Sequence, residues 1–164
     1  MNNGLKQSSI NDEIYTPPEA LNSLLYYCYN FLQDKTILEC CYGEGDLAKH
    51  LTNLQLKVNG SKNVDFFKRE YVIEDVIITN PPYSNKRNFI ERALKLDKPF
   101  AMLVPLTTLE GKKSNELFSN NEIQIIIPSK RINFLKHKKG SWFAVIWICY
   151  KMNLPKQINF YKQN

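Results

Sequence analysis

Short apolar runs alternate with segments of helical periodicity along most of this chain. Most of these runs are rich in β-branched or aromatic residues, as strands are; they span 36–39, 56–62, 76–79, 98–105, 122–128 and 142–150. Two intervening segments, 17–33 and 88–96, carry apolar side chains at helical spacing. This alternation predicts an α/β fold whose sheet is mostly parallel and covered on both faces, with an antiparallel strand near the C-terminus.

Length and composition fit one globular domain. We expect residues 1–164 to form a single domain without a separate target-recognition domain. No apolar run reaches membrane-spanning length, so no membrane contact is expected. The four cysteines, two of them adjacent at Cys40 and Cys41, lack metal-ligand spacing, and His50 and His137 are isolated, so no metal site is expected. Such cysteines are typical of free thiols in a reducing compartment, which predicts a cytoplasmic location.

The tetrapeptide Asn80-Pro81-Pro82-Tyr83 directly follows the strand pattern at 76–79. Two consecutive prolines cannot donate to a sheet ladder and each fixes its own φ, so the strand must end here in a stiff loop. Asn80 offers a carboxamide oxygen and Pro81 a carbonyl, and two acceptors on a rigid turn suit an exocyclic amino group. Tyr83 is placed to stack on the flat ring that carries the amine. The alternative is an ordinary proline turn with Tyr83 as a surface aromatic.

A second motif lies upstream, between 36 and 48. An apolar strand ends at Glu39, Gly43 and Gly45 form a Gly-x-Gly turn, and a helix is predicted to begin near Asp46. Glycine adopts positive φ and lets a ligand approach the backbone without a Cβ in the way. Ligands of doubly wound sheets bind beyond the carboxyl ends of the strands. The turn therefore indicates a ligand site; the alternative is a simple strand-to-helix connection.

A third segment, from Tyr15 to Ala20, precedes the first helical pattern. Thr16 is suited to cap that helix, whose first turn would hold Pro17, Pro18 and Glu19. Capping alone accounts for these residue types without any ligand.

Together and in this order, the three segments resemble the amino-methyltransferases that use S-adenosylmethionine, most closely the small phage-type DNA adenine (N6) methyltransferases. The resemblance extends from about Tyr15 to Tyr150 and implies a Rossmann-like class I methyltransferase fold with a sheet of the seven-stranded type. It implies S-adenosylmethionine as cofactor and transfer of its methyl group to the exocyclic amine of adenine. The implied catalytic residues are Asn80, Pro81, Pro82 and Tyr83, and the implied cofactor-binding residues are Tyr15, Thr16, Glu39, Gly43, Gly45, Asp65 and Phe66.

Two positions depart from the family's pattern. The family carries an acid at the end of its second strand for the ribose hydroxyls, whereas this chain has Ser61 and Lys62, and a lysine cannot accept hydrogen bonds. Tyr42 places a bulky ring where the family has a small residue beside the donor. These positions keep open a degenerate methyltransferase fold that binds nucleic acid or scaffolds an active partner. A further alternative is an enzyme acting on RNA adenine or on a protein glutamine amide.

The chain is basic, with a net charge of +6 and a pI of about 9.1, which favours a polyanionic partner. Basic residues follow the tetrapeptide and the strand at 122–128; they are Lys86, Arg87, Lys130, Arg131, Lys136, Lys138 and Lys139. Loops after parallel strands face the ligand crevice, so we expect phosphate contacts with nucleic acid, DNA rather than RNA. Target recognition would come from this loop or from a partner subunit. The alternative is a solvated loop that only keeps the protein soluble.

Overall fold

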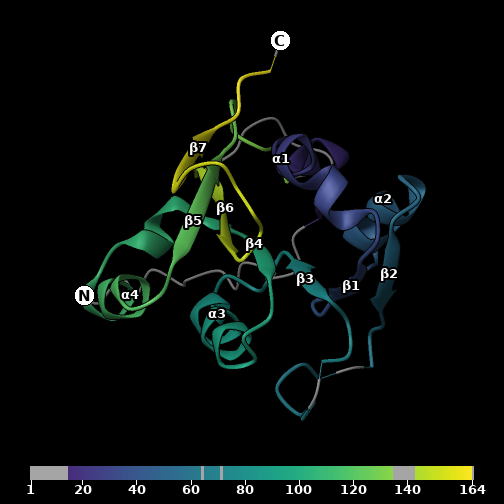
Figure 1. Cartoon of the computed structure of the whole chain (residues 1–164), viewed down its shortest axis with the longest axis horizontal. Coiled ribbons are helices and arrows are strands. Elements are labelled where there is room, and N and C mark those ends of the chain that lie inside the picture. The colour runs from purple at the N-terminus through teal and green to yellow at the C-terminus, as the bar shows by residue number, and fades with distance from the viewer. Residues whose placement is uncertain (1–14, 64, 71, 135–142, 164) are drawn as a thin grey trace, which may run out of the picture.

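Seven strands form one sheet in the computed structural model, which describes residues 15–63, 65–70, 72–134 and 143–163 (Figure 1). The order across the sheet is β2-β1-β3-β4-β6-β5-β7. The strands are β1 (Thr36–Glu39), β2 (Lys57–Gly60), β3 (Val76–Thr79), β4 (Phe100–Pro105), β5 (Ile123–Ile127), β6 (Val145–Tyr150) and β7 (Ile158–Phe160). The helices are α1 (Asn22–Leu32), α2 (Asp46–Asn53), α3 (Lys86–Lys95) and α4 (Lys112–Ser119), with 3-10 turns at Pro18–Leu21 and Leu106–Leu109.

The sheet is parallel except at β6. β1 pairs in parallel with β2 and β3, β3 with β4, and β5 with β7. β6 is antiparallel to both of its neighbours, β4 and β5, so β5 runs in the same direction as β4. This confirms the predicted α/β sheet with an antiparallel strand near the C-terminus. The carboxyl ends of β1, β3, β4 and β5 consequently share one edge, from which their loops leave.

Alternate residues of the central strands face two separate hydrophobic cores. Ile37 and Trp147 belong to the core that includes side chains of α1 and α2, whereas Leu38 and Ile148 belong to the core that includes side chains of α3. Figure 1 shows α1 and α2 grouped away from α3. Because both faces are covered, the central strands are apolar on both sides, which accounts for the continuous apolar runs in the sequence.

The helices differ from the expected ones mainly at their ends. The segment 17–33 is divided into the 3-10 turn and α1, and α3 begins two residues before the predicted Asn88. The predicted helix cap at Thr16 is wrong: Pro17 is the cap residue of the 3-10 turn, and no side chain caps that turn. Two elements, α4 and β7, have no counterpart in the sequence-based expectation. None of the helices in the described part of the chain is long and apolar enough to cross a membrane.

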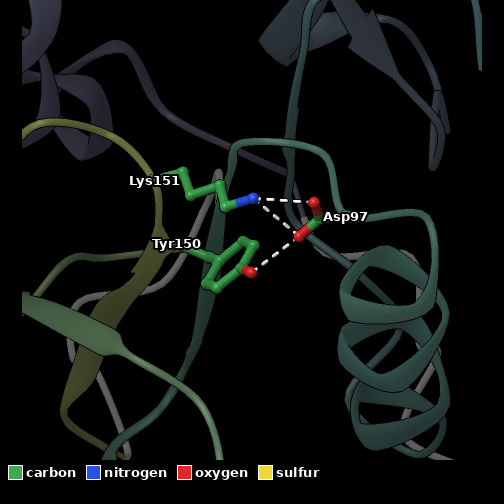
Figure 2. A network of polar contacts seen from close by, with 3 residues as sticks. All are labelled: Asp97, Tyr150 and Lys151. Carbon is green, nitrogen blue, oxygen red and sulfur yellow. Dashed lines mark hydrogen bonds and ion pairs between the residues drawn. The ribbon is translucent and has the colours of Figure 1, made fainter.

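A polar network ties the α3–β4 turn to the end of β6 (Figure 2). Tyr150 Oη donates to Asp97 Oδ1 at 2.8 Å, and Lys151 Nζ lies 2.7 Å from both carboxylate oxygens of Asp97. The hydrogen bonds from Lys151 and then Tyr150 lower the pKa of Asp97. Since Tyr150 pairs with Phe100, the first residue of β4, this network lies at the edge opposite the carboxyl ends of the parallel strands.

Candidate active site

Adjacent parallel strands bring the ends of the two sequence motifs together. β1 ends at Glu39 and β3 ends at Thr79, and the two strands are neighbours in the sheet. Thr79 Oγ1 donates a hydrogen bond to Glu39 Oε1, and the backbone N–H of Cys41 donates to the same oxygen at 2.9 Å. Glu39 and Thr79 are both buried, with exposed fractions of 2% and 0%. Glu39, the acid that ends β1, is therefore fixed beside the start of the tetrapeptide loop.

Burial changes the acidity of this carboxyl group. Desolvation raises the pKa of Glu39 from 4.5 to about 7, although the hydrogen bonds from Thr79 and Cys41 favour the ionised form. Near neutral pH, Glu39 therefore exists in both protonation states. A ligand that brings a positive charge to this site stabilises the carboxylate.

The carboxamide of Asn80 is held by a residue far away in sequence. Asn80 Nδ2 donates to Thr16 Oγ1 at 3.0 Å, and Thr16 is buried with an exposed fraction of 5%. His50 Nε2 donates to the backbone carbonyl of Thr16 at 3.1 Å, because a carbonyl oxygen can only accept. With its nitrogen occupied, the amide presents Oδ1, which is buried and has no hydrogen-bond partner among the described residues.

The rest of the tetrapeptide forms a closed turn. Asn85 N–H donates to the carbonyl of Pro82 at 2.9 Å, and Lys86 Nζ donates to the carbonyl of Tyr83 at 2.9 Å. Pro81 is buried. The Tyr83 ring packs edge-on against Phe143, with ring centroids 5.5 Å apart. Burial raises the pKa of Tyr83, whose hydroxyl is a second buried polar atom without a partner in the described part of the chain.

A small cavity of about 40 Å³ joins the two motifs with the Tyr-Thr-Pro segment. Gly43 and Gly45 have φ of +51° and +83°, which confirms that the turn needs glycine. Gly45 is also the N-cap residue of α2, which begins at Asp46. The residues that line this cavity are Thr16, Glu39, Cys41, Tyr42, Gly43, Glu44, Asp46, Leu47 and Asn80. Three of the implied cofactor residues, Thr16, Glu39 and Gly43, lie here, and half-buried Tyr15 is adjacent in sequence to Thr16.

Four implied cofactor residues, Tyr15, Gly45, Asp65 and Phe66, do not line this cavity. Asp65 is exposed; its carboxylate accepts from the N–H of Phe67 at 2.9 Å and pairs with Lys68 at 3.8 Å. Phe66 is buried in the core on the α3 side, where its ring stacks on Phe89 with centroids 5.7 Å apart. Their implied contact with adenine stays a prediction.

The basic residues at this edge are in different environments. Lys130 and Arg131 are exposed and follow β5, whose carboxyl end lies at the same edge as those of β1 and β3. Lys86 is held to the carbonyl of Tyr83, and Arg87 donates to Ser114 Oγ at 3.2 Å. The remaining predicted phosphate contacts, Lys136, Lys138 and Lys139, lie outside the described residues.

The sequence resembles that of one curated methyltransferase. The Type II methyltransferase M.EcoRI of Escherichia coli is 25% identical over 120 residues, which make up 69% of this chain and 32% of that protein. The chain thus spans about a third of the length of this relative. No protein-family model matches the sequence.

Solved structures share the arrangement of the sheet and helices. A candidate class I S-adenosylmethionine-dependent methyltransferase from Listeria monocytogenes matches with a TM-score of 0.64 at 15% identity, over 96% of this chain and 68% of that one. The fold is that of the class I methyltransferases. A second protein with this fold, the modification subunit of a candidate type I restriction enzyme from Vibrio vulnificus, matches with a TM-score of 0.52 at 14% identity, over 94% of this chain and 48% of that one. The class I methyltransferase fold is consistent with S-adenosylmethionine as cofactor.

Sequence reasoning missed two hydrogen-bond partners in this candidate site. Thr79, the bond partner of Glu39, ends a strand pattern, and knowledge of the strand order would have placed it beside Glu39. His50, which the sequence presents as an isolated surface residue, is half-buried and bonds to Thr16. No local pattern at His50 indicates this contact.

Proposed function

We propose that the chain transfers the methyl group of S-adenosylmethionine to the exocyclic amine of adenine in nucleic acid, DNA rather than RNA. The observation that carries this proposal is the buried, unpartnered Oδ1 of Asn80 within the described part of the chain. Its amide nitrogen is already bonded to Thr16, so the oxygen is available as an acceptor for an N–H group. Leaving such an atom unpaired costs about 1–3 kcal/mol, which a bound amine would recover.

The residues on the other side of the cavity fit the amino-acid end of the donor. Glu39 offers a carboxylate for an ammonium group, and its raised pKa makes it responsive to that charge. The glycine turn leads into the N-terminus of α2, where backbone N–H groups favour a carboxylate. When bound, S-adenosylmethionine supplies a methyl group made electrophilic by its sulfonium. The carboxylate of Glu39 and the turn at Gly43 would hold the donor.

The tetrapeptide would hold the acceptor. The carbonyls of Pro82 and Tyr83 are already bonded, which leaves Asn80 Oδ1 and the Pro81 carbonyl as the acceptors assigned to the amine. Two hydrogen bonds from the amine would fix the direction of its nitrogen lone pair. Because the reacting groups lose their freedom of movement when they bind, the entropy cost is already met before the chemical step. The activation barrier is therefore lower without a strong base. A base within a duplex must be flipped out to reach this loop.

Charge and the comparisons support a nucleic-acid substrate. The exposed Lys130 and Arg131 lie at the same edge as Asn80, and the whole chain carries +6. The chain is similar in sequence to a segment that makes up about a third of a Type II methyltransferase. It is similar in fold to about half of a restriction-enzyme modification subunit. We therefore propose that a partner subunit supplies recognition of the target sequence.

One observation favours a second candidate function. Tyr42 and the Glu44–Lys62 ion pair, with Nζ and Oε1 2.9 Å apart, lie at the donor cavity and suit a degenerate fold that binds nucleic acid without methyl transfer. Failure of the folded protein to bind S-adenosylmethionine at millimolar concentration would favour this candidate.

The decisive experiment measures transfer of an isotope-labelled methyl group from S-adenosylmethionine to single-stranded DNA, duplex DNA, RNA and protein in parallel. We expect labelled N6-methyladenine from DNA, identified by mass spectrometry of the nucleosides. Asn80→Ala should lower the rate about 10²-fold or more while donor binding persists. Asn120→Ala is a matched control, because Asn120 caps the end of α4 through a bond to Glu116. An unchanged rate in Asn80→Ala would contradict the role of Asn80, and label in RNA or glutamine would change the acceptor.

A further inference from the structure

The ring of Tyr42 lies directly on two glycine backbones. Gly45 precedes α2 and Gly60 ends β2. A Cβ added to Gly45 would lie 2.7 Å from Tyr42 Oη, and one added to Gly60 would lie 2.8 Å from Tyr42 Cδ2. Carbon atoms do not approach other heavy atoms this closely, so neither position admits a side chain while the ring is there. This conformation of the Tyr42 ring therefore requires glycine at both positions, whether or not a ligand also requires it.

The position of the ring explains why the cavity at Asn80 is small. That cavity, about 40 Å³, has room for only a few water molecules, at about 10–15 Å³ each. A second, larger cavity of about 420 Å³ is lined by Glu39, Gly60, Ser61 and Glu74 among others. The ring thus lies against Gly60 of the larger cavity and lines the smaller one, and Glu39 is shared by both.

The larger cavity contains a buried hydrogen-bond acceptor, the carboxylate of Glu74, which neighbouring side chains hold in place. Glu74 is buried, with an exposed fraction of 3%, and its Oε1 accepts from Asn59 Nδ2 at 3.3 Å and from Arg69 at 3.2 Å. Its Oε2 has no hydrogen-bond partner among the described residues. Leu38 and Val58 supply apolar walls. A cavity of this size with an unpaired carboxylate oxygen suits a flat ligand that carries hydrogen-bond donors, as a nucleoside does.

We propose that Tyr42 is a gate within the donor site. The proposal rests on the function proposed above: the nucleoside end of the donor binds only after the Tyr42 ring has left Gly45 and Gly60. The two cavities then join, and an extended ligand reaches from the Asn80 side toward Glu74. Tyr42 is half-buried, so its ring has solvent to rotate into, and the Glu44–Lys62 pair outside it is exposed and weak.

A closed gate lowers the apparent affinity of the donor. If only a fraction of molecules has the ring rotated out, the measured dissociation constant equals the intrinsic one divided by that fraction. Removal of the ring removes this penalty. Tyr42→Ala should therefore bind S-adenosylhomocysteine about tenfold tighter or more, whereas Tyr42→Phe, which keeps the ring, should bind as the wild-type chain does.

The test is calorimetric titration of S-adenosylhomocysteine into the full wild-type chain, Tyr42→Ala and Tyr42→Phe, each checked for its thermal unfolding. Tighter binding by the alanine variant alone supports the gate. Equal or weaker binding by that variant, with measurable binding by the wild type, overturns the gate but leaves the donor site standing. Absence of binding by all three folded chains overturns the proposed donor site itself. If Tyr42→Ala does not fold, Tyr42→Leu serves instead, since leucine is too short to reach Gly45 as the phenol does.

Discussion

Thr16 Oγ1 accepts a hydrogen bond from Asn80 Nδ2 across 64 positions of sequence. This bond restrains the Asn80 amide and leaves Oδ1 without a partner among the described residues, and His50 in turn holds the backbone of Thr16. An amide turned by half a revolution would present donors to an amine and repel it. The segment before the first helix is thereby bonded to the loop after β3, and we expect it to control the chemistry of that loop.

Thr16→Val tests this control, because valine keeps the shape of threonine without its hydroxyl. We expect transfer to fall about tenfold or more, as the loss of one buried hydrogen bond costs about 1–3 kcal/mol and frees the amide to turn. Thr16→Ser should restore most of the rate. Steady-state kinetics at saturating donor would measure this, and equal rates for valine and serine would show that the hydroxyl does not position Asn80.

Glu39 makes stability depend on pH. Its folded pKa of about 7 lies above the ordinary value of 4.5, so the folded protein prefers the protonated carboxyl. The stabilisation is fully present below about pH 4.5 and is lost as pH rises to about 7; a shift of this size corresponds to about 3 kcal/mol. Urea unfolding at pH 5 to 8 should show this loss in the wild type and a smaller one in Glu39→Gln. The same slope in both chains would show that Glu39 is not its source.

Donor affinity should change with pH in the opposite direction. An ammonium group on the ligand favours the ionised Glu39, and below pH 7 the bound state must first lose that proton. We expect the dissociation constant of S-adenosylhomocysteine to rise up to tenfold per pH unit below 7 and to level off above it. Adenosine, which lacks the ammonium group, is the matched ligand and should show no such trend. A similar trend for both ligands would locate the titrating group elsewhere.

Lys130 and Arg131 should contribute to nucleic-acid affinity through phosphate contacts. Each contact with duplex DNA contributes about 0.9 to the slope of log K against log salt concentration. Replacing both by alanine should reduce that slope by up to about 2, measured by fluorescence anisotropy at several salt concentrations. The pair Lys95→Ala and Lys156→Ala removes the same charge from exposed positions near the opposite edge. Equal slopes for the two double variants would show that the change in salt dependence comes from net charge and not from phosphate contacts of Lys130 and Arg131.

The network of Asp97, Tyr150 and Lys151 is expected to affect stability and not transfer. The lowered pKa of Asp97 contributes stability above its ordinary value of 3.8, and this contribution is lost as pH falls through the folded pKa. Asp97→Asn suits the test because Asp97 has a φ of +53°, which asparagine tolerates. We expect a slightly lower Tm than that of the wild type at pH 6 and low salt, and a difference that shrinks as pH falls below 3.8. A change in the rate of methyl transfer would show that the network at this edge of the sheet affects the candidate active site at the opposite edge.

The sequence by itself determined the features that depend on near neighbours. The prolines after Thr79 end β3 wherever that strand lies, and the positive φ of Gly43 and Gly45 is a property of the turn itself. The apolar runs became buried strands because a sheet covered on both faces needs them. α4 and β7 gave weaker signals: α4 buries only Ser114, and β7 buries Asn159 while Phe160 stays exposed, the reverse of the usual pattern.

Only the tertiary structure decided which motif residues act on each other. Thr16 was free in sequence to cap its own helix, and it lies beside Asn80 because the chain before α1 passes the end of β3. Tyr42 meets Gly60 because β1 and β2 pair in register, with Glu39 opposite Gly60. The pKa of Glu39 depends on the burial that this packing produces. Long-range contacts of this kind follow from strand order and from competition among whole elements, which no local pattern encodes.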